Sequence, residues 1–402
     1  MKKYLIILCD GMADEPLDEL EGRTPLEAAC TPNLDELASG SEIGMVRTVP
    51  KGMAPGSDTA NLSVMGYDPE KYYTGRSPLE ALSIGVDMAG DDVSFRCNLV
   101  TLSEEEEAYA DRRILDHSSG EISTEDAAVL IDALKSGLQR EGYEFYVGTS
   151  YRHLLIWKHG QVVELTAPHD ILTSRIGEYL PQDTVLREMM VKSYDILSKH
   201  PINLKRKEQG LNPANSAWFW GGGTRPALSS FEEKYHLKGA VVSAVDLLKG
   251  IAAGTGMRNI SVEGANGGLD TNYAGKGEAA VEALLGEDDF VYVHIEAPDE
   301  MGHQGSIENK ITAIERIDAQ IIGPAVEKLR EKKTDFRMLV LPDHPTPVRV
   351  RTHVSDPVPY LLYDSTAKLD GAFDAYNEKT GQESGILIEK GHTLIKHLFE
   401  QE

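Results

Sequence analysis

The sequence predicts an α/β protein in which a mostly parallel sheet, flanked by helices, carries an inserted smaller α+β domain. Continuous apolar runs at residues 4–9, 290–295 and 337–341 are typical of strands that are buried on both faces. Apolar side chains spaced three or four residues apart over 307–329 predict an amphipathic helix that crosses the sheet. We therefore expect the last two strands to be parallel neighbours.

The domain organisation follows from where polar groups interrupt this pattern. A chain of 402 residues allows about two to three domains of roughly 150 residues each. Acidic groups follow apolar strands near both ends of the chain, so the middle must leave the sheet and return to it. Within the middle, residues 122–125 predict a capped helix start and 152–157 predict a short strand. We predict a core from residues 1–95 and 226–402, and an inserted domain over 96–225.

Composition and charge exclude several classes of function. Forty Lys and Arg residues against 65 Asp and Glu residues give a net charge of −25, which repels nucleic acids and anionic membranes. No apolar run approaches the roughly 18 residues needed to span a bilayer, and the N-terminal run lacks a signal-peptide cleavage site. Three cysteines without a C-x-x-C pair favour the reducing cytoplasm. The acidic surface favours a monomer, although a dimer is also compatible with it.

Carboxylates and imidazoles gather after the predicted strands, where open α/β sheets bind ligands. This set of donors suits Mn²⁺ or Zn²⁺, with Mg²⁺ as an alternative. An i, i+4 spacing can direct two donors to one ion, whereas adjacent donors can reach two ions, as in two-metal phosphoryl-transfer centres. Each residue alone could be a surface acid, a helix cap or a core histidine, but the set together indicates a site. The donors are Asp10, Asp299, His303, Asp343, His344 and His353.

A serine beside these donors is a candidate nucleophile. Ser57 follows Gly56 at a predicted helix start, where backbone N–H groups and the helix dipole present positive charge. The alternative is that Ser57 only caps the helix. Metal coordination can activate a serine hydroxyl, and Thr59 is a competing hydroxyl two residues further on.

Seven motifs together resemble the cofactor-independent phosphoglycerate mutases of the alkaline phosphatase superfamily, in the archaeal-type branch that also has bacterial members. The likeness runs in order from residue 4 to about residue 363, and it implies an alkaline-phosphatase-like core. The motifs are CDGMAD at 9–14, GRTPLEA at 22–28, TPNL at 31–34, GSDTANLSVMGYDP at 56–69, EAPDEMGH at 296–303, PDHP at 342–345 and THVSDPVP at 352–359.

The resemblance implies a role for each matching residue. Ser57 is implied to be the phosphorylated nucleophile. One metal ion is implied to bind to Asp10, Ser57, Asp343 and His344, and a second to Asp299, His303 and His353. Mn²⁺ is favoured, Zn²⁺ and Mg²⁺ are alternatives, and no bisphosphoglycerate is required. The candidate substrate-binding residues are Arg76, Asn98, Arg112, Arg152, His153 and Lys276.

The implied reaction converts 3-phosphoglycerate to 2-phosphoglycerate. Ser57 takes the phosphoryl group, and the enclosed glycerate takes it back on its other hydroxyl. The inserted domain would exclude water from the phosphoserine. His117, His153 and His169 are candidates for a general base that acts on glycerate.

A rival function remains open within the same branch, because some bacterial relatives are proposed homoserine kinases. The chain has no G-x-x-x-x-G-K-[ST] motif, so a kinase would have to use the Ser57 centre. Asp111 or Asp170 could then bind the ammonium group of homoserine. Phosphatases, phosphodiesterases and sulfatases share the metal core, so the site rather than the fold must decide the function.

Overall fold

The computed structural model describes residues 2–367 and 373–400, and the chain divides into two compact units. The core unit comprises Met1–Tyr73 and Ala227–Glu402, and the inserted unit comprises Thr74–Pro226. The predicted first boundary, after residue 95, falls inside strand β3 (Val93–Leu102) of the inserted unit. The preceding helix, α5 (Arg76–Ser83), belongs with that strand, because the Ser77 hydroxyl donates to the Ser94 carbonyl at 2.7 Å.

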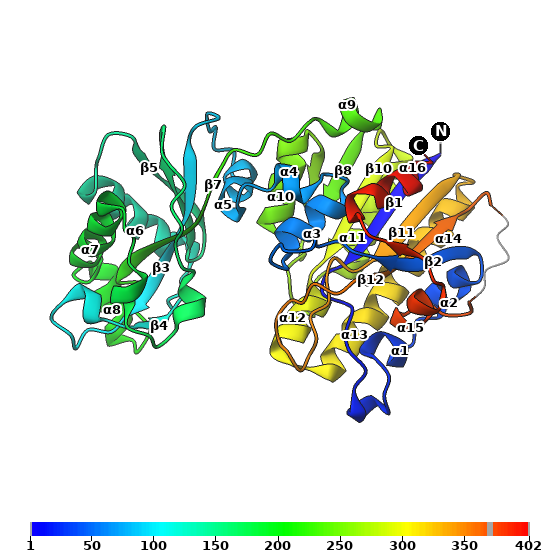
Figure 1. Cartoon of the computed structure of the whole chain (residues 1–402), viewed down its shortest axis with the longest axis horizontal. Coiled ribbons are helices and arrows are strands. Elements are labelled where there is room, and N and C mark those ends of the chain that lie inside the picture. The colour runs from blue at the N-terminus through cyan, green and yellow to red at the C-terminus, as the bar shows by residue number, and fades with distance from the viewer. Residues whose placement is uncertain (1, 368–372, 401–402) are drawn as a thin grey trace. The chain divides into compact units, whose positions relative to one another are not determined.

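An eight-stranded sheet lies at the centre of the core unit (Figure 1). Its order is β13-β2-β12-β11-β1-β10-β8-β9, and only the β11–β12 and β12–β2 pairings are antiparallel. The strands are β1 (Lys3–Cys9), β2 (Ser41–Val46), β8 (Gly239–Val242), β9 (Arg258–Ile260), β10 (Phe290–Ile295), β11 (Phe336–Leu341), β12 (Val358–Asp364) and β13 (Leu387–Ile388).

The predicted fold class is confirmed, but the predicted neighbour relation is wrong. Strand β1 lies between β10 and β11, with Leu5 opposite both Val291 and Met338. The connection from β10 to β11 therefore crosses over β1, which the apolar pattern of the last two strands alone could not reveal. All three strands are parallel, so their carboxyl ends meet at one edge of the sheet.

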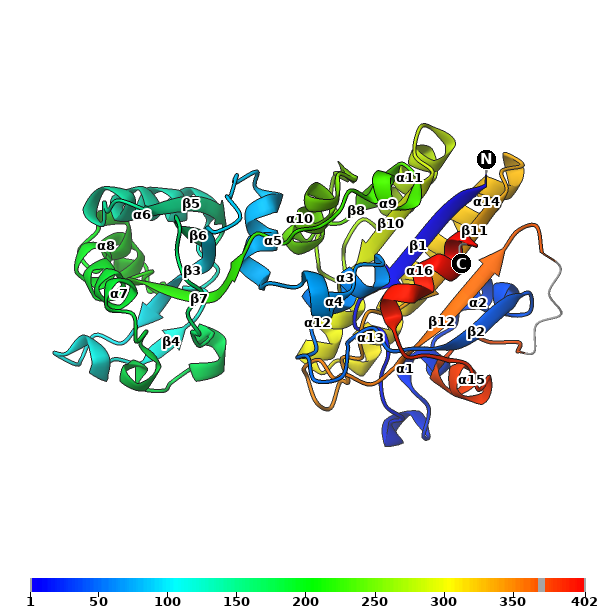
Figure 2. The same ribbon diagram turned by 45° about the horizontal axis from the view of Figure 1, so that its top comes forward.

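Helices cover both faces of the core sheet (Figure 2). Leu5 and Ile7 face α11, α13 and α14 on one side, whereas Tyr4 contacts Phe399 of α16 with ring centres 5.0 Å apart. Among the described residues, no helix is long and apolar enough to cross a membrane. The helices are α1 (Pro25–Ala28), α2 (Pro32–Ala38), α3 (Ser57–Val64), α4 (Pro69–Tyr72), α9 (Phe231–Tyr235), α10 (Asp246–Thr255), α11 (Tyr273–Leu285), α12 (Ala297–Gln304), α13 (Ile307–Ile317), α14 (Gly323–Glu331), α15 (Glu378–Glu383) and α16 (Leu394–Phe399).

The amphipathic crossover is present, but it is not one regular α-helix. A π-helical turn over Asp318–Ile322 separates α13 from α14. Pro324 has no N–H to donate to the preceding turn, which favours the wider turn at this point. The buried Asp318 carboxylate accepts a hydrogen bond from the Leu34 N–H at 2.8 Å, which fixes α2 against the turn.

The inserted unit is an α+β domain built on an antiparallel sheet. The path of the sheet is β4-β3-β6-β5, and β7 also pairs with β3. The predicted strand 152–157 is confirmed as β6, and Ser123 caps the predicted helix start by accepting from the Asp126 N–H. The other elements are β4 (Ile114–Asp116), β5 (Tyr143–Thr149), β7 (Ser216–Thr224), α6 (Thr124–Gly137), α7 (Thr184–Leu197) and α8 (Pro201–Glu208).

The first and last residues of the inserted unit lie against each other. The Thr74 hydroxyl donates to the Thr224 carbonyl at 2.6 Å. A Cβ atom added at Gly223 would lie only 2.1 Å from the Thr74 carbonyl oxygen, so a glycine is required for this approach. The chain therefore enters and leaves the inserted unit through one pair of adjacent segments.

Candidate active site and metal centre

The six predicted metal donors all lie in the core unit, at the carboxyl edge of its sheet. One follows β1, two stand on α12 directly after β10, and three lie in the segment that follows β11. They approach one another in two sets that share one histidine. The donors are Asp10, then Asp299 and His303, then Asp343, His344 and His353.

The first set surrounds the Ser57 hydroxyl. His344 Nε2 lies 3.7 Å from Asp10 Oδ1 and 3.4 Å from Asp343 Oδ2. Ser57 Oγ lies 3.2 Å from His344 Nε2 and 3.5 Å from Asp10 Oδ2. The structure thus brings together the four groups that the family resemblance assigns to one metal ion.

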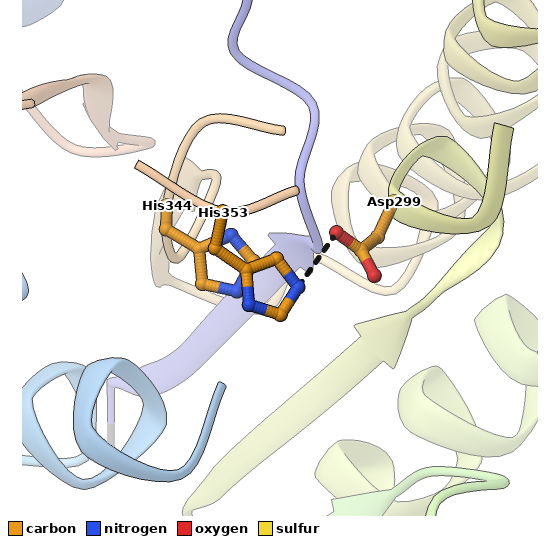
Figure 3. A group of neighbouring side chains, drawn as sticks. All are labelled: Asp299, His344 and His353. Carbon is orange, nitrogen blue, oxygen red and sulfur yellow. Dashed lines mark ion pairs between the residues drawn. The ribbon is translucent and has the colours of Figure 1, made fainter. Parts of the chain in front are cut away.

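The second set is centred on Asp299. Its carboxylate lies 3.1 Å from His303 Nε2 and 3.5 Å from His353 Nε2, as expected for an i, i+4 pair facing a third donor. The Nε2 atoms of His303 and His353 are 3.0 Å apart. Figure 3 shows His344 beside His353, and their ring centres are 4.0 Å apart, so His344 stands next to both sets.

These residues fit divalent metal ions. Asp10 Oδ1 is buried and has no hydrogen-bond partner among the described residues, which is costly for a carboxylate unless a cation binds it. Burial, together with the nearby Asp343 and Asp299 carboxylates, raises the pKa of Asp10 well above its ordinary value. A cation would relieve this repulsion, and carboxylates mixed with imidazoles suit Mn²⁺ or Zn²⁺.

The second set shows the opposite electrostatic balance. Burial alone would raise the pKa of Asp299, but hydrogen bonds with His303 and His353 hold that pKa well below its ordinary value. The hydrogen bond with Asp299 in turn raises the pKa of His303 to about 9. Because a metal ion binds the neutral imidazole, an ion at this set would take the place of the proton between His303 and Asp299.

Ser57, rather than Thr59, carries the hydroxyl beside the donors. Helix α3 begins at Ser57 with Gly56 at the N-cap, and no side chain caps it, so the alternative that Ser57 is only a cap is wrong. Thr59 is buried, and its hydroxyl donates to the Gly56 carbonyl at 3.0 Å. The Ser57 hydroxyl therefore lies at the positive end of the helix and within reach of the first set of donors.

Two residues that hold the metal donors were missed by the sequence reasoning. Asn61 donates to Asp343 Oδ2 at 2.9 Å and to the Ser57 carbonyl at 2.8 Å. His294 Nε2 lies 2.8 Å from Asp10 Oδ2, and burial lowers the pKa of His294 to about 3. Two signals could have found them: Asn61 is four residues after Ser57, and His294 interrupts an apolar strand.

Lys276 has a different environment from the one expected of a substrate ligand. It is completely buried, and its ammonium donates to the His294 carbonyl at 3.2 Å. Burial lowers its pKa to about 8. Lys276 lies in the first turns of α11, on the side of the helix that faces the sheet. Its hydrogen bond therefore joins α11 to β10.

Other predicted substrate residues gather in a basic cluster of the inserted unit. Trp220 Nε1 donates to Asn98 Oδ1 at 3.0 Å, and Asn98 is the partner of Arg152 in the β3–β6 register. The Arg96 guanidinium lies 4.4 Å from the Trp220 ring centre, and both Arg96 and Arg76 pair with Glu80. The cluster comprises Arg76, Arg96, Asn98, His117, Arg152, His169 and Trp220, of which sequence reasoning did not identify Arg96.

His153 and Arg112 are buried within the inserted unit. The Gly148 N–H donates to His153 Nδ1 at 3.1 Å, and burial lowers the pKa of His153 to about 4, so the ring is neutral at pH 7. Arg112 lies 4.1 Å from the Tyr194 ring centre and donates to the Ser103 carbonyl at 2.6 Å. These contacts give Arg112 a structural role that its sequence position did not indicate.

The two acids considered for an ammonium group differ in their partners. Asp111 forms an ion pair with Arg175. Asp170 lies 3.7 Å from His169 Nε2, beside the basic cluster, and both of these side chains are exposed. Neither acid stands among groups that would select an ammonium over an anion.

A serine at a helix start, set among two groups of carboxylates and imidazoles at the carboxyl edge of a parallel sheet, defines a metal-dependent phosphoryl-transfer enzyme. A family model described as 2,3-bisphosphoglycerate-independent phosphoglycerate mutase matches residues 38–203. A mutase of that name from Methanosarcina barkeri is 47% identical over 98% of this chain and 98% of its own length. A probable mutase from Geobacter sulfurreducens is 45% identical over 99% of this chain and 100% of its own length. The chain therefore belongs to the 2,3-bisphosphoglycerate-independent phosphoglycerate mutase family.

Solved structures agree with this assignment. A protein from Pyrococcus horikoshii matches with a TM-score of 0.81 and 31% identity, covering 99% of this chain and 97% of that one. The cofactor-independent phosphoglycerate mutase of Thermoplasma acidophilum matches with a TM-score of 0.65 and 28% identity, covering 100% and 99%. The family resemblance predicted from the motifs is confirmed, and these comparisons give no support to the homoserine kinase alternative.

Proposed function

We propose that this chain interconverts 3-phosphoglycerate and 2-phosphoglycerate through a phosphoserine at Ser57, without bisphosphoglycerate. One observation carries the proposal. The Ser57 hydroxyl lies 3.2 Å from His344 Nε2, among a full set of metal donors, in a chain 47% identical to a mutase over nearly its whole length. The neighbouring Asp10 and Asp343 complete the set around this hydroxyl.

Two divalent ions belong to the proposal, with Mn²⁺ favoured over Zn²⁺ and Mg²⁺. When bound, such ions would lower the pKa of a serine hydroxyl and draw electron density from the phosphoryl oxygens. Three imidazoles in the donor sets argue against Mg²⁺, which prefers oxygen ligands and retained water. One ion would be held by Asp10, Ser57, Asp343 and His344, and the other by Asp299, His303 and His353.

The protein's own residues would prepare Ser57 for transfer. The first turn of α3 presents backbone N–H groups and a positive dipole where a phosphoryl group on Ser57 would lie. Asn61 links Asp343 to the Ser57 backbone, and His294 holds the Asp10 carboxylate. Because these contacts fix the reacting groups before substrate binds, little reorganisation is needed during transfer.

The basic cluster of the inserted unit would recognise the anionic substrate. Its arginines are an exception in a chain with a net charge of −25, and they suit a metabolite that carries both a carboxylate and a phosphate. Arg152, with Asn98 beside it, would bind one of these groups. The rings of His117 and His169, with centres 6.0 Å apart, are the candidates for moving the proton of the glycerate hydroxyl.

The net charge of the chain also bears on the partners and the location of the enzyme. A net charge of −25 disfavours nucleic acids and anionic membranes as partners. We place the enzyme in the cytoplasm, acting as a monomer on its small phosphorylated substrate. Size-exclusion chromatography with light scattering tests the monomer, and a mass of two chains would contradict it.

The deciding experiment is conversion of 3-phosphoglycerate to 2-phosphoglycerate by purified, Mn²⁺-loaded protein with no bisphosphoglycerate added. We expect the Ser57→Ala variant to lose activity by on the order of 10⁴-fold or more, because it lacks the nucleophile. Thr59→Val is the matched control, since it removes the competing hydroxyl from the same turn, and it should stay within about tenfold of the wild type. Mass spectrometry of the rapidly quenched wild type should find phosphate on the peptide that contains Ser57.

Three outcomes would overturn the proposal. Conversion that persists in Ser57→Ala would exclude the nucleophile, and the same loss in both variants would leave Ser57 without a special role. Failure of folded, metal-loaded wild type to convert 3-phosphoglycerate would exclude the mutase. The same preparation given homoserine and ATP would then test the rival kinase.

A further inference from the structure

The Thr346 hydroxyl connects the two donor sets. Thr346 follows His344 by two residues in the segment after β11. Its Oγ1 lies 2.5 Å from Asp299 Oδ1 and 3.3 Å from His344 Nδ1. Asp299 is the centre of the second set, and His344 completes the first set, so one side chain touches a ligand candidate of each.

The direction of each hydrogen bond follows from the chemistry of the groups. An ionised carboxylate only accepts, so the Thr346 hydroxyl donates its single proton to Asp299. The lone pairs of Oγ1 can then only accept from His344 Nδ1. The neutral His344 ring is thereby fixed with its proton on Nδ1 and a lone pair on Nε2, the atom that faces Asp10 and Ser57.

The surroundings hold the Thr346 hydroxyl in this position. Thr346 is completely buried, and its carbonyl accepts from the Lys310 ammonium at 2.9 Å. A Cβ atom added at Gly11 would lie 2.6 Å from Thr346 Oγ1, and one added at Gly302 would lie 2.4 Å from its carbonyl oxygen. Gly11 also has a φ of +61°, so both the space and the backbone at this point require glycine.

We propose that Thr346 is a positioning residue that sets the His344 tautomer for metal binding and couples the two metal sites. The inference rests on the proposed metal-dependent function, because it concerns ligands of the same centre. Outer hydrogen bonds of this kind typically change metal affinity by about 10- to 100-fold when they are removed. Thr346 touches ligands rather than substrate, so its loss should change metal binding before it changes substrate binding.

Calorimetric titration of the metal-free full chain with Mn²⁺ tests the effect of Thr346 on metal affinity, and it requires no turnover of substrate. We expect two ions to bind to the wild type. Thr346→Val keeps the side-chain volume but removes the hydroxyl, and it should bind Mn²⁺ about 10- to 100-fold more weakly. Thr346→Ser restores the hydroxyl and should return to within a few fold of the wild type. A Thr346→Val protein with wild-type affinity for both ions would overturn the proposal, as would a Thr346→Ser protein as weak as the valine variant.

The tautomer is tested in the wild type itself, which removes any dependence on how the variants fold. In metal-free protein labelled with ¹⁵N-histidine, the His344 ring should carry its proton on Nδ1, with the signal assigned by its loss in His344→Gln. A proton on Nε2 would overturn the proposal. If the wild type binds no Mn²⁺ while the ring is an Nδ1–H tautomer, the metal-dependent function fails and the hydrogen-bond assignment stands, so the two failures are distinguishable.

Discussion

The core unit and the inserted unit satisfy their buried polar groups in different ways. In the core, the buried carboxylates of Asp10 and Asp14 face ionisable groups: neighbouring carboxylates and imidazoles for Asp10, and the Lys310 ammonium for Asp14. In the inserted unit, buried Asn203 donates to the carbonyls of Leu197 and Ala214. Removal of Lys310 would therefore leave a charge buried without its partner, whereas replacement of Asn203 removes only hydrogen bonds between uncharged groups.

Replacement of Lys310 should have the largest effect on stability. Its ammonium is completely buried and lies 2.7 Å from Asp14 Oδ2, so Lys310→Met would leave that carboxylate without its cation. We expect the free energy of unfolding of the core to fall by about 3–5 kcal/mol. Hydrogen exchange of core amides in increasing denaturant measures it. The double variant Lys310→Met/Asp14→Asn should recover part of the loss, and a single-variant loss below about 1 kcal/mol would contradict the comparison.

Removal of metal should affect the core alone. All the proposed ligands belong to the core unit, so Mn²⁺ at about 100 times its dissociation constant should add about 2.7 kcal/mol to core stability for each bound ion, and chelation should remove this stability. The three tryptophans, Trp157, Trp218 and Trp220, all lie in the inserted unit. Their fluorescence should therefore report an unfolding transition that chelation leaves unchanged. If chelation shifted the unfolding transition seen by tryptophan fluorescence as much as that of the core, the two units would not respond to the metal separately.

The inserted unit should lose stability in mild acid through His153. Burial lowers the pKa of His153 in the folded protein to about 4, from an ordinary 6.5. As the pH falls below 6.5, this histidine is therefore protonated in the unfolded chain before it is protonated in the folded one. Stability is therefore present above pH 6.5 and is lost as the pH falls toward 4, by about 2 kcal/mol between pH 7 and pH 5. Denaturation followed by tryptophan fluorescence at both pH values measures this loss. His153→Gln should remove that share of the pH dependence, and an identical pH dependence in both proteins would exclude His153 as its source.

The smallest effect is expected from the ion pair between Lys158 and Asp92 in the inserted unit. Hydrogen bonds from the Ala89 N–H and from Lys158 outweigh burial and hold the pKa of Asp92 below its ordinary value. In Lys158→Met the carboxylate keeps its bonds from the N–H groups of Ala89 and His159, and the lysine side chain is 30% exposed. We expect a loss of about 1 kcal/mol or less by the same fluorescence measurement. A loss as large as that of Lys310→Met would remove the contrast between the units.

The sequence predicted which donors of the core unit lie close together, because these donors follow local patterns. Asp10 and Asp343 each follow an apolar run that ends at the same edge of a parallel sheet, and Asp299 and His303 stand one helical turn apart. The shared position of His344 beside both sets was not predictable, since it depends on how three loops approach one another.

The basic cluster shows why the inserted unit was harder to predict. Arg96 meets Trp220 through the β3–β7 register, which shifts between Ser94 and Arg96. An irregularity of this kind changes which side chains face each other, and no spacing along either strand reveals it. The early boundary of this unit was missed for a similar reason, because only the packing of α5 against β3 and β7 assigns this helix to the unit.

The contact between Thr74 and Thr224 also bears on how such a protein can diversify. A domain whose two ends touch can be removed from its host and replaced by another of the same kind, because the host chain needs only a short bridge to close the gap. Evolution, or a protein engineer, could therefore exchange the inserted unit while the core unit, with all the proposed metal ligands, stays intact. A grafted or circularly permuted version of residues 74–226 is the natural form in which to study that unit by itself.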